Sequence, residues 1–147
     1  MAGTFSQIYI QAVFAVKYRQ SLILPSWEDA LFKYITGIVQ KKEQKMLAIN
    51  GMPDHIHFLF RMAPTCCISD LVREVKKSSN KFTPIKFQWQ GGFGAFSYCN
   101  SDVYKVINYI MNQKQHHQKV TFKNEYLGLL KEFGIEFKEE YLFNWFE

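Results

Sequence analysis

The stretch Asp-His-Ile-His-Phe-Leu-Phe-Arg at positions 54–61 decides how this chain is expected to fold. Successive side chains of a β-strand point to opposite faces of the sheet. In a strand over residues 55–61, the two imidazoles of His55 and His57 therefore share one face. The other face carries the apolar side chains of Ile56, Phe58 and Phe60. These apolar side chains need a core to fill, so the stretch predicts a strand of a sheet with one face packed.

A second strand is predicted near the beginning of the chain, where residues 5–18 alternate with period two. One face would hold Ile8, Ile10, Ala12, Phe14 and Val16, and the other Gln7, Tyr9, Gln11, Val13 and Lys17. This pattern also predicts a strand with one buried face.

Helices are predicted between and after the strands. Ser26 and Asp29 resemble a capping box at the start of the first helix. Apolar residues at helical spacing then predict helices over about 27–42, 68–81 and 102–118, and a fourth from about 122.

Two further strands complete the predicted sheet, over residues 45–50 and, less regularly, 93–98, with a turn at 51–54. The order β-α-β-β-α followed by a last strand predicts an α+β fold, a ferredoxin-like or RRM-like antiparallel sheet. We expect helices on one face of the sheet, the other face free for a ligand, and a C-terminal helix that carries Tyr109.

Length and composition predict a single domain spanning residues 1–147, with a net charge of +5. A basic excess suits a polyanionic partner but does not by itself indicate one. The three cysteines, two of them adjacent, do not fit a disulfide framework. Neither a leader nor an apolar run of ~18 residues is evident, so we expect a cytoplasmic protein with no membrane partner.

The pair His55 and His57 is the sharpest chemical signal in the sequence. Two imidazoles on one face of a strand can converge on a divalent ion that polarises a phosphate oxygen. Isolated pairs of this kind are also common in strands that bind no metal.

Tyr109 is the second signal, because it lies off the apolar stripe of the predicted helix over 102–118. Gln113 follows one turn later on the same side, where its amide oxygen could ligate a hard cation, and His116 and His117 are nearby. Phenol has a pKa of about 10 and attacks poorly at neutral pH unless a cation or a base assists.

A basic segment with interleaved rings is the third signal. Such a combination can hold a phosphate backbone and stack bases, although it is equally typical of the charged end of an amphipathic helix. It comprises Lys76, Lys77, Ser78, Ser79, Asn80, Lys81, Phe82, Lys86, Phe87 and Trp89.

Together these motifs resemble the single-tyrosine HUH transposases of bacterial insertion sequences. The resemblance extends to Tyr141 and is carried by segments in order: 12–19, Asn-Gly-Met-Pro-Asp-His-Ile-His at 50–57, Lys-Lys-Ser-Ser at 76–79, Trp-Gln-Gly-Gly-Phe-Gly-Ala-Phe-Ser at 89–97, Tyr-Ile-Met-Asn-Gln at 109–113, and 114–117.

The resemblance implies a role for each matching residue. His55, His57 and Gln113 would hold a divalent ion, Mg²⁺ or Mn²⁺, with an accessory role for Asp54. Tyr109 would attack single-stranded DNA, forming a 5′-phosphotyrosine, and a 3′-hydroxyl would later reverse the attack without a nucleotide cofactor. Members of the family generally form homodimers and recognise hairpins at the ends of the element.

DNA contacts are expected from the basic end of the first strand, the basic segment and the last histidines. The set is Lys17, Arg19, Lys76, Lys77, Ser78, Ser79, Lys81, Trp89, His116 and His117. Gln11 departs from the family, which usually has a histidine there. We expect this change to affect a DNA contact or an accessory role and to touch neither of the metal histidines.

Three alternatives remain open. The chain could be a non-catalytic binder that stacks single-stranded bases on its sheet. It could be a structural zinc protein using His55, His57, Cys66 and Cys67, although adjacent cysteines suit one tetrahedral ion poorly. Within the family, it could be a domesticated relative that processes chromosomal repeats.

Overall fold

The structure, a computed structural model, describes residues 3–86, 88–139 and 142. Its four-stranded sheet has the order β2-β3-β1-β4, and all neighbouring strands are antiparallel. The strands are β1 (Tyr9–Ala15), β2 (Lys45–Met52), β3 (His55–Arg61) and β4 (Gly94–Tyr98). The helices are η1 (Lys17–Arg19), α1 (Pro25–Lys41), α2 (Ile68–Phe82), η2 (Asn100–Asp102), α3 (Val103–Met111), α4 (Gln113–His116) and α5 (Phe122–Glu132). The predicted ferredoxin-like α+β fold is confirmed.

The first strand is shorter than predicted and is buried on both faces. Regular pairing begins at Tyr9 and ends at Ala15, and all seven residues are buried. Val16 makes only an isolated bridge to Trp89, after which the chain turns through η1 with Tyr18 at a φ of 60°. The prediction of one buried face is therefore wrong, because helices cover both sides of the sheet.

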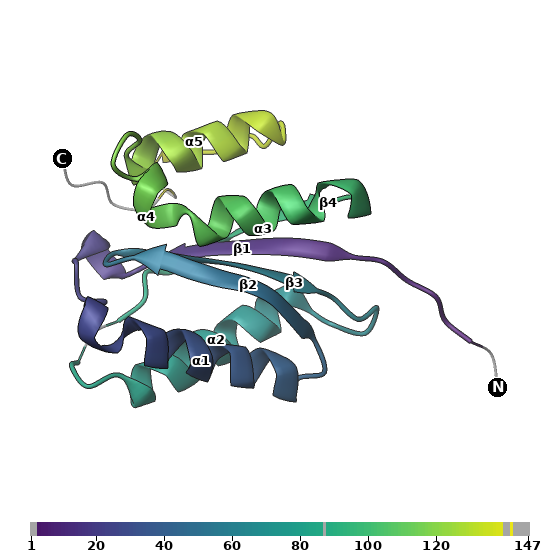
Figure 1. Cartoon of the computed structure of the whole chain (residues 1–147), viewed down its shortest axis with the longest axis horizontal. Helices are drawn as coiled ribbons and strands as arrows, with labels where there is room; N and C mark the ends of the chain where they lie inside the picture. Colours follow the sequence, from purple (N-terminus) through teal and green to yellow (C-terminus); the bar gives the residue numbers. More distant parts are fainter. Residues whose placement is uncertain (1–2, 87, 140–141, 143–147) are drawn as a thin grey trace.

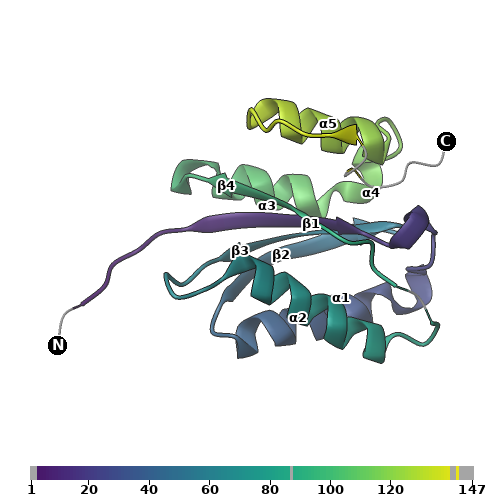
Figure 2. The ribbon, with the colours of Figure 1, turned by 180° about the vertical axis from the view of Figure 1, so that it is seen from behind.

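Two helical layers enclose the sheet. In Figure 1, α1 and α2 lie below the sheet, and α3 and α5 lie above it; Figure 2 shows the same order from behind. The upper layer forms because α3 has an apolar stripe of its own to bury. That stripe, Val103, Val106 and Ile110, packs with Tyr9, Ala48 and Leu59 of the sheet. The face that the sequence predicted to be free for a ligand is therefore covered by α3.

Helix boundaries differ from the predictions in two places. Helix α1 begins at Pro25 with Leu24 as its N-cap and has no side-chain cap, so the capping box of Ser26 and Asp29 does not form. The single helix predicted over 102–118 is divided at Asn112, whose φ and ψ are −100° and 21°. After Asn112, α4 leads the chain from the end of α3 toward α5 (Figure 1).

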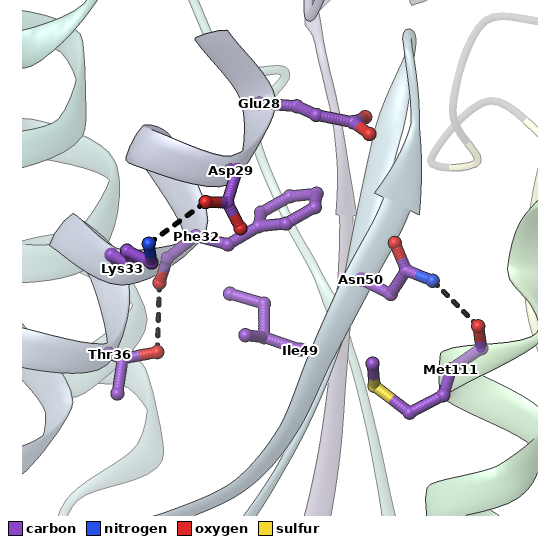
Figure 3. Close-up of a pocket in the computed structure, with 8 residues that line it drawn as sticks. All are labelled: Glu28, Asp29, Phe32, Lys33, Thr36, Ile49, Asn50 and Met111. Atoms are coloured by element: carbon purple, nitrogen blue, oxygen red, sulfur yellow. Dashed lines mark hydrogen bonds and ion pairs between the residues drawn. The ribbon is translucent and has the colours of Figure 1, made fainter. Parts of the chain in front are cut away.

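The division at Asn112 is held by contacts to the edge strand β2. Asn50 Nδ2 donates to the carbonyl oxygen of Met111 at 3.0 Å, beside a cavity of about 260 Å³ between α1 and β2 (Figure 3). Lys114 Nζ reaches Glu28 Oε1 at 3.0 Å and donates to the Gly51 carbonyl oxygen at 3.0 Å. These contacts place α4 against the end of β2, next to the His55 end of β3.

Gly51 permits a close approach between β2 and β3. It pairs with Ile56, and a Cβ atom at this position would clash with the carbonyl oxygen of His55. Only glycine allows the two backbones to lie this close without displacing one of them.

Among the described residues, no helix combines the length and the apolarity that crossing a membrane requires.

Candidate active site

His55 and His57 lie on the upper face of β3, and both are buried, with 1% and 0% of their surfaces exposed. The alternation predicted for this strand is confirmed, because Ile56, Phe58 and Phe60 belong to the apolar core of the other face. The centroids of the two imidazole rings are 5.2 Å apart. The ring of His55 also stacks on Phe122 of α5, with a centroid distance of 3.8 Å.

Asp54 fixes the orientation of the first histidine. Its Oδ1 lies 2.7 Å from His55 Nδ1, which leaves His55 Nε2 directed into the site. Burial lowers the pKa of His55 to about 4, so the ring is neutral at pH 7. A neutral imidazole that is oriented through Nδ1 is the form that ligates metal ions.

Gln11 orients the second histidine, and the expectation that it touches neither histidine is wrong. Its Oε1 lies 2.9 Å from His57 Nδ1, and its Nε2 donates to the hydroxyl of Tyr98 at 2.7 Å. The contact arises because β1 and β3 are neighbours: Gln11 pairs with Leu59, two residues along β3 from His57. The side chain of Gln11 is completely buried.

Tyr109 reaches the same site from α3. Its ring is half-buried and meets the ring of His57 edge-on, with a centroid distance of 5.8 Å. Its hydroxyl donates a short hydrogen bond to Glu125 Oε2. Burial and the Glu125 carboxylate raise the pKa of Tyr109 above the ordinary value, because both disfavour the phenolate.

Gln113, the first residue of α4, is completely buried in the site. Its Oε1 lies 3.4 Å from His55 Nε2, and its Nε2 donates to Glu125 Oε2 at 2.9 Å. The structure therefore brings together Tyr109, His55, His57, Gln113 and Asp54, as the sequence predicted.

Glu125, at the centre of the site, was not predicted from the sequence. Its Oε1 lies 3.0 Å from His57 Nε2, 3.1 Å from His117 Nε2 and 3.6 Å from His55 Nε2. Burial alone would raise its pKa, but the adjacent His57 and the hydrogen bonds from His117 and His57 hold the pKa well below the usual range. One signal was available: Glu125 shares the helical spacing of the buried residues Phe122 and Tyr126, where an unpaired charge would be costly.

His116 and His117 face this site and not the basic segment. His117 Nδ1 lies 2.8 Å from the Val120 carbonyl oxygen, and its Nε2 approaches Glu125. His116 Nε2 is 3.2 Å from Glu125 Oε2, without the geometry of a hydrogen bond. Burial lowers the pKa of His116.

Four of these residues could hold a metal ion. His55, His57, His117 and Glu125 each offer one ligand atom, and the four atoms lie within 4.8 Å of one another. This group contains neither Cys66 nor Cys67, whose thiols are free at the start of α2. The structure therefore does not support a structural zinc site that uses the two cysteines.

Several residues predicted to contact DNA instead make contacts within the fold. Trp89 is only 7% exposed and donates through Nε1 to the hydroxyl of Ser79 at 2.8 Å. Lys76 Nζ donates to the carbonyl oxygens of Gln90 and Gly92 at 2.8 and 2.6 Å, and burial lowers its pKa to about 8. We therefore correct the prediction for Trp89 and Ser79, whose side chains are buried, whereas a DNA contact from Lys76 stays a prediction.

The other basic candidates lie at the surface. Lys17, Lys77 and Lys81 are exposed, and Ser78 donates to Glu74 Oε1 at 3.0 Å. Three predictions fall outside the described part of the chain: Phe87, Tyr141 and the side chain of Arg19.

Comparisons with known proteins identify transposases as relatives of this chain. The family model described as "Transposase IS200 like" matches residues 4–113. The ISDra2 transposase TnpA of Deinococcus radiodurans is 25% identical over 103 residues, which cover 66% of this chain and 74% of the relative.

Two solved structures share the fold. One, a putative transposase from Deinococcus radiodurans, has a TM-score of 0.61 and 21% identity over 77% of this chain and 95% of its own. The other, the REP-associated tyrosine transposase bound to a REP hairpin, has a TM-score of 0.64 and 20% identity over 82% of this chain and 74% of its own. The residues matched by the family model include Tyr109 and Gln113 but end before His117 and Glu125.

Proposed function

This chain belongs to the family of IS200-like transposases, which are DNA-cleaving enzymes, and we propose that it cuts and rejoins single-stranded DNA with Tyr109 as the nucleophile. In the proposed reaction Tyr109 forms a covalent bond to the 5′-phosphate and releases a free 3′-hydroxyl. The observation that carries the proposal is that Tyr109 and His57 meet at one buried carboxylate, Glu125, within a single chain.

The donor atoms around His55 and His57 fit a divalent ion, Mg²⁺ or Mn²⁺. Both rings are held through Nδ1, by Asp54 and Gln11, so that both Nε2 atoms face the site. Gln113 Oε1 lies close enough to join them. When bound, such an ion supplies Lewis acidity that polarises a phosphate oxygen.

The protein's own groups position the nucleophile and its proton. Tyr109 Oη donates to Glu125 Oε2, so the carboxylate is placed to receive the phenol proton as Oη attacks phosphorus. The Oη–P bond forms while the bond from phosphorus to the 3′-oxygen breaks, and the departing oxygen takes up a proton. The phosphotyrosine retains the energy of the phosphodiester, so a second 3′-hydroxyl can reverse the step without a nucleotide cofactor.

We propose single-stranded DNA with hairpin ends as the partner, a homodimer as the working form and the cytoplasm as the location. A REP hairpin is the ligand of one structural neighbour, which supports the choice of DNA. The exposed residues Lys17, Lys77 and Lys81 remain our proposals for phosphate contacts, together with Arg19.

The principal alternative, a non-catalytic binder that stacks bases on its sheet, is disfavoured by the covered sheet. Stacking of that kind requires aromatic side chains on an open sheet face. Here α3 packs on the sheet through Val103 and Val106, and Trp89 is buried. A domesticated relative that processes repeats would use the same chemistry, and matching hairpins on both sides of the gene would argue against that alternative.

The proposed reaction is tested by trapping the covalent intermediate. The full chain is incubated with Mg²⁺ or Mn²⁺ and a 3′-labelled single strand that carries a hairpin and its flanking sequence. We expect a labelled protein adduct that survives denaturation and disappears in Tyr109→Phe. The matched control is Tyr104→Phe, since Tyr104 lies on the same helix and is 82% exposed. An adduct in Tyr109→Phe, or reversible binding alone in the wild type, would contradict the proposal.

A further inference from the structure

We propose that His117 and Glu125 are metal ligands together with His55 and His57, so that the site is a three-histidine, one-carboxylate centre for a divalent transition-metal ion. The inference deepens the proposed function, since it concerns the ion used at the same site. Neither His117 nor Glu125 lies within the residues that match the family model.

All three histidines are oriented in the same way. The Nδ1 atoms of His55, His57 and His117 lie 2.7, 2.9 and 2.8 Å from oxygen atoms. These oxygens belong to the Asp54 carboxylate, the Gln11 amide and the Val120 main chain. Because each oxygen is an acceptor, each Nδ1 carries a proton, and a neutral ring with this tautomer presents a lone pair at Nε2.

The three Nε2 lone pairs converge on one carboxylate oxygen. The distances to Glu125 Oε1 are 3.0 Å from His57, 3.1 Å from His117 and 3.6 Å from His55. A lone pair directed at a buried carboxylate oxygen is unfavourable unless a proton or a metal ion lies between the two atoms. One divalent ion would occupy the place of the protons in these contacts, since the four ligand atoms lie within 4.8 Å of one another.

The second oxygen of Glu125 is held by neighbours that are not in this set. Gln113 Nε2 and the Tyr109 hydroxyl both donate to Oε2. The carboxylate is thus fixed from one side and presents Oε1 to the histidines. Ligands oriented by such outer contacts bind metal ions more tightly than mobile ones.

The number and type of ligands select the ion. Imidazole nitrogens favour first-row transition metals over Mg²⁺. A tetrahedral ion such as Zn²⁺ is saturated by four protein ligands, as in structural sites. An octahedral ion such as Mn²⁺ keeps two positions beyond these four, enough for Gln113 and one phosphate oxygen. We therefore expect Zn²⁺ to bind tightly and to inhibit, and Mn²⁺ to bind more weakly and to support cleavage.

The inference is tested by metal binding in the absence of DNA. Zn²⁺ and Mn²⁺ affinities of the metal-free full chain are measured by calorimetry, and Co²⁺ is followed by its visible absorption, which is intense when the ion is tetrahedral. We expect one ion per chain and a tetrahedral Co²⁺ spectrum. His117→Ala and Glu125→Gln should each weaken Zn²⁺ binding at least about tenfold and reduce the Co²⁺ absorption.

Matched controls separate lost ligands from damaged folding. Gln118→Ala and Glu132→Gln replace exposed residues beside His117 and on the same helix as Glu125, and should bind Zn²⁺ as the wild type does. Thermal unfolding in chelator confirms that each variant folds. Added Zn²⁺ should then raise the Tm of the wild type and the controls more than that of His117→Ala or Glu125→Gln, because it binds only the folded state.

The possible results distinguish this inference from the proposed function. If His55→Ala abolishes Zn²⁺ binding but His117→Ala and Glu125→Gln bind as the wild type does, the inference is overturned and the two-histidine site stands. If His55→Ala and His57→Ala also bind Zn²⁺ normally, or if the wild type binds no ion, both metal assignments fail. The tyrosine adduct is tested separately by Tyr109→Phe.

Discussion

The two helical layers that cover the sheet (Figure 1) pack against it with different kinds of side chains. Between the sheet and the α1–α2 layer lies an apolar core that contains Phe14, Phe58 and Phe60, all with no exposed surface. Between the sheet and the α3–α5 layer, a smaller apolar cluster gives way to a buried polar group centred on Glu125. The face toward α1 and α2 is stabilised by the burial of apolar area. The face toward α3 and α5 is stabilised only if its buried polar groups form hydrogen bonds or ion pairs with one another.

The comparison supports the proposal of a functional site on the α3–α5 face without reference to a family. Burying a titratable group costs folding free energy unless the group has a partner. Clusters of buried titratable groups are therefore typical of functional sites. His55, His57 and Glu125 are all buried in one small volume. Substitutions on the apolar face should therefore lower stability, whereas substitutions on the polar face should change the pH dependence or the metal affinity.

The largest effect on stability is expected from Phe58→Ala on the apolar face. Phe58 is fully buried and packs edge-on against Phe14. Removing the ring leaves a cavity and should lower the free energy of unfolding by about 3–5 kcal/mol in urea denaturation. The adduct formed per folded molecule should not change. Phe137→Ala, at a ring that is 47% exposed, is the control. Equal losses of unfolding free energy in the two variants would contradict the placement of Phe58 in the apolar core.

The next effect is a pH dependence that arises on the polar face. Burial lowers the pKa of His55 to about 4 in the folded chain, whereas the unfolded value is near 6.5. Between these values the unfolded chain binds more protons, so stability present above pH 6.5 is lost as the pH falls toward 4, by up to about 3 kcal/mol. Urea denaturation in chelator measures it. His55→Asn should flatten the dependence, and an unchanged slope would refute this origin.

A smaller effect is expected from Gln11→Leu, which removes the contact to His57 Nδ1 but keeps a similar volume. Loss of an outer contact of this kind should weaken Mn²⁺ binding about 10- to 100-fold, measured by calorimetry. Gln11→Glu retains an acceptor at this position and should keep most of the affinity. If leucine and glutamate give the same affinity, Gln11 does not orient His57.

The smallest effect is expected from Thr121→Ala at the start of α5. Thr121 accepts a hydrogen bond from the Asn124 amide at 3.2 Å and caps the helix that carries Glu125. Losing an N-cap costs about 1 kcal/mol of unfolding free energy, which thermal unfolding can detect. Thr121→Ser keeps the cap and should unfold as the wild type does, whereas equal losses from serine and alanine would argue against capping.

The sequence predicted the parts of the fold that follow from short-range periodicity. Alternation over residues 55–61 gave the correct strand and the correct phase of His55 and His57. Tyr109 lies off the apolar stripe of its helix, and the structure places its hydroxyl at Glu125. Such patterns are readable because they repeat within one element.

The missed features all depend on contacts between distant elements. Gln11 and His57 are 46 residues apart, and His57 and Glu125 are 68 apart. No local pattern reports which strand will neighbour β3 or where α5 will dock. The division of the helix at Asn112 is equally non-local, because its contacts come from Asn50 of β2. Trp89 was assigned to DNA for a related reason: a ring suited to stacking is also suited to a core.

The absence of a side chain at Gly51 has a genetic consequence. A Cβ atom there would push against the His55 carbonyl oxygen, so any replacement must part β2 from β3 where the first imidazole is attached. A Gly51 variant would therefore displace His55 while it keeps every side chain of the site. Screens for loss of transposition should therefore recover alleles of a codon that contributes no functional group.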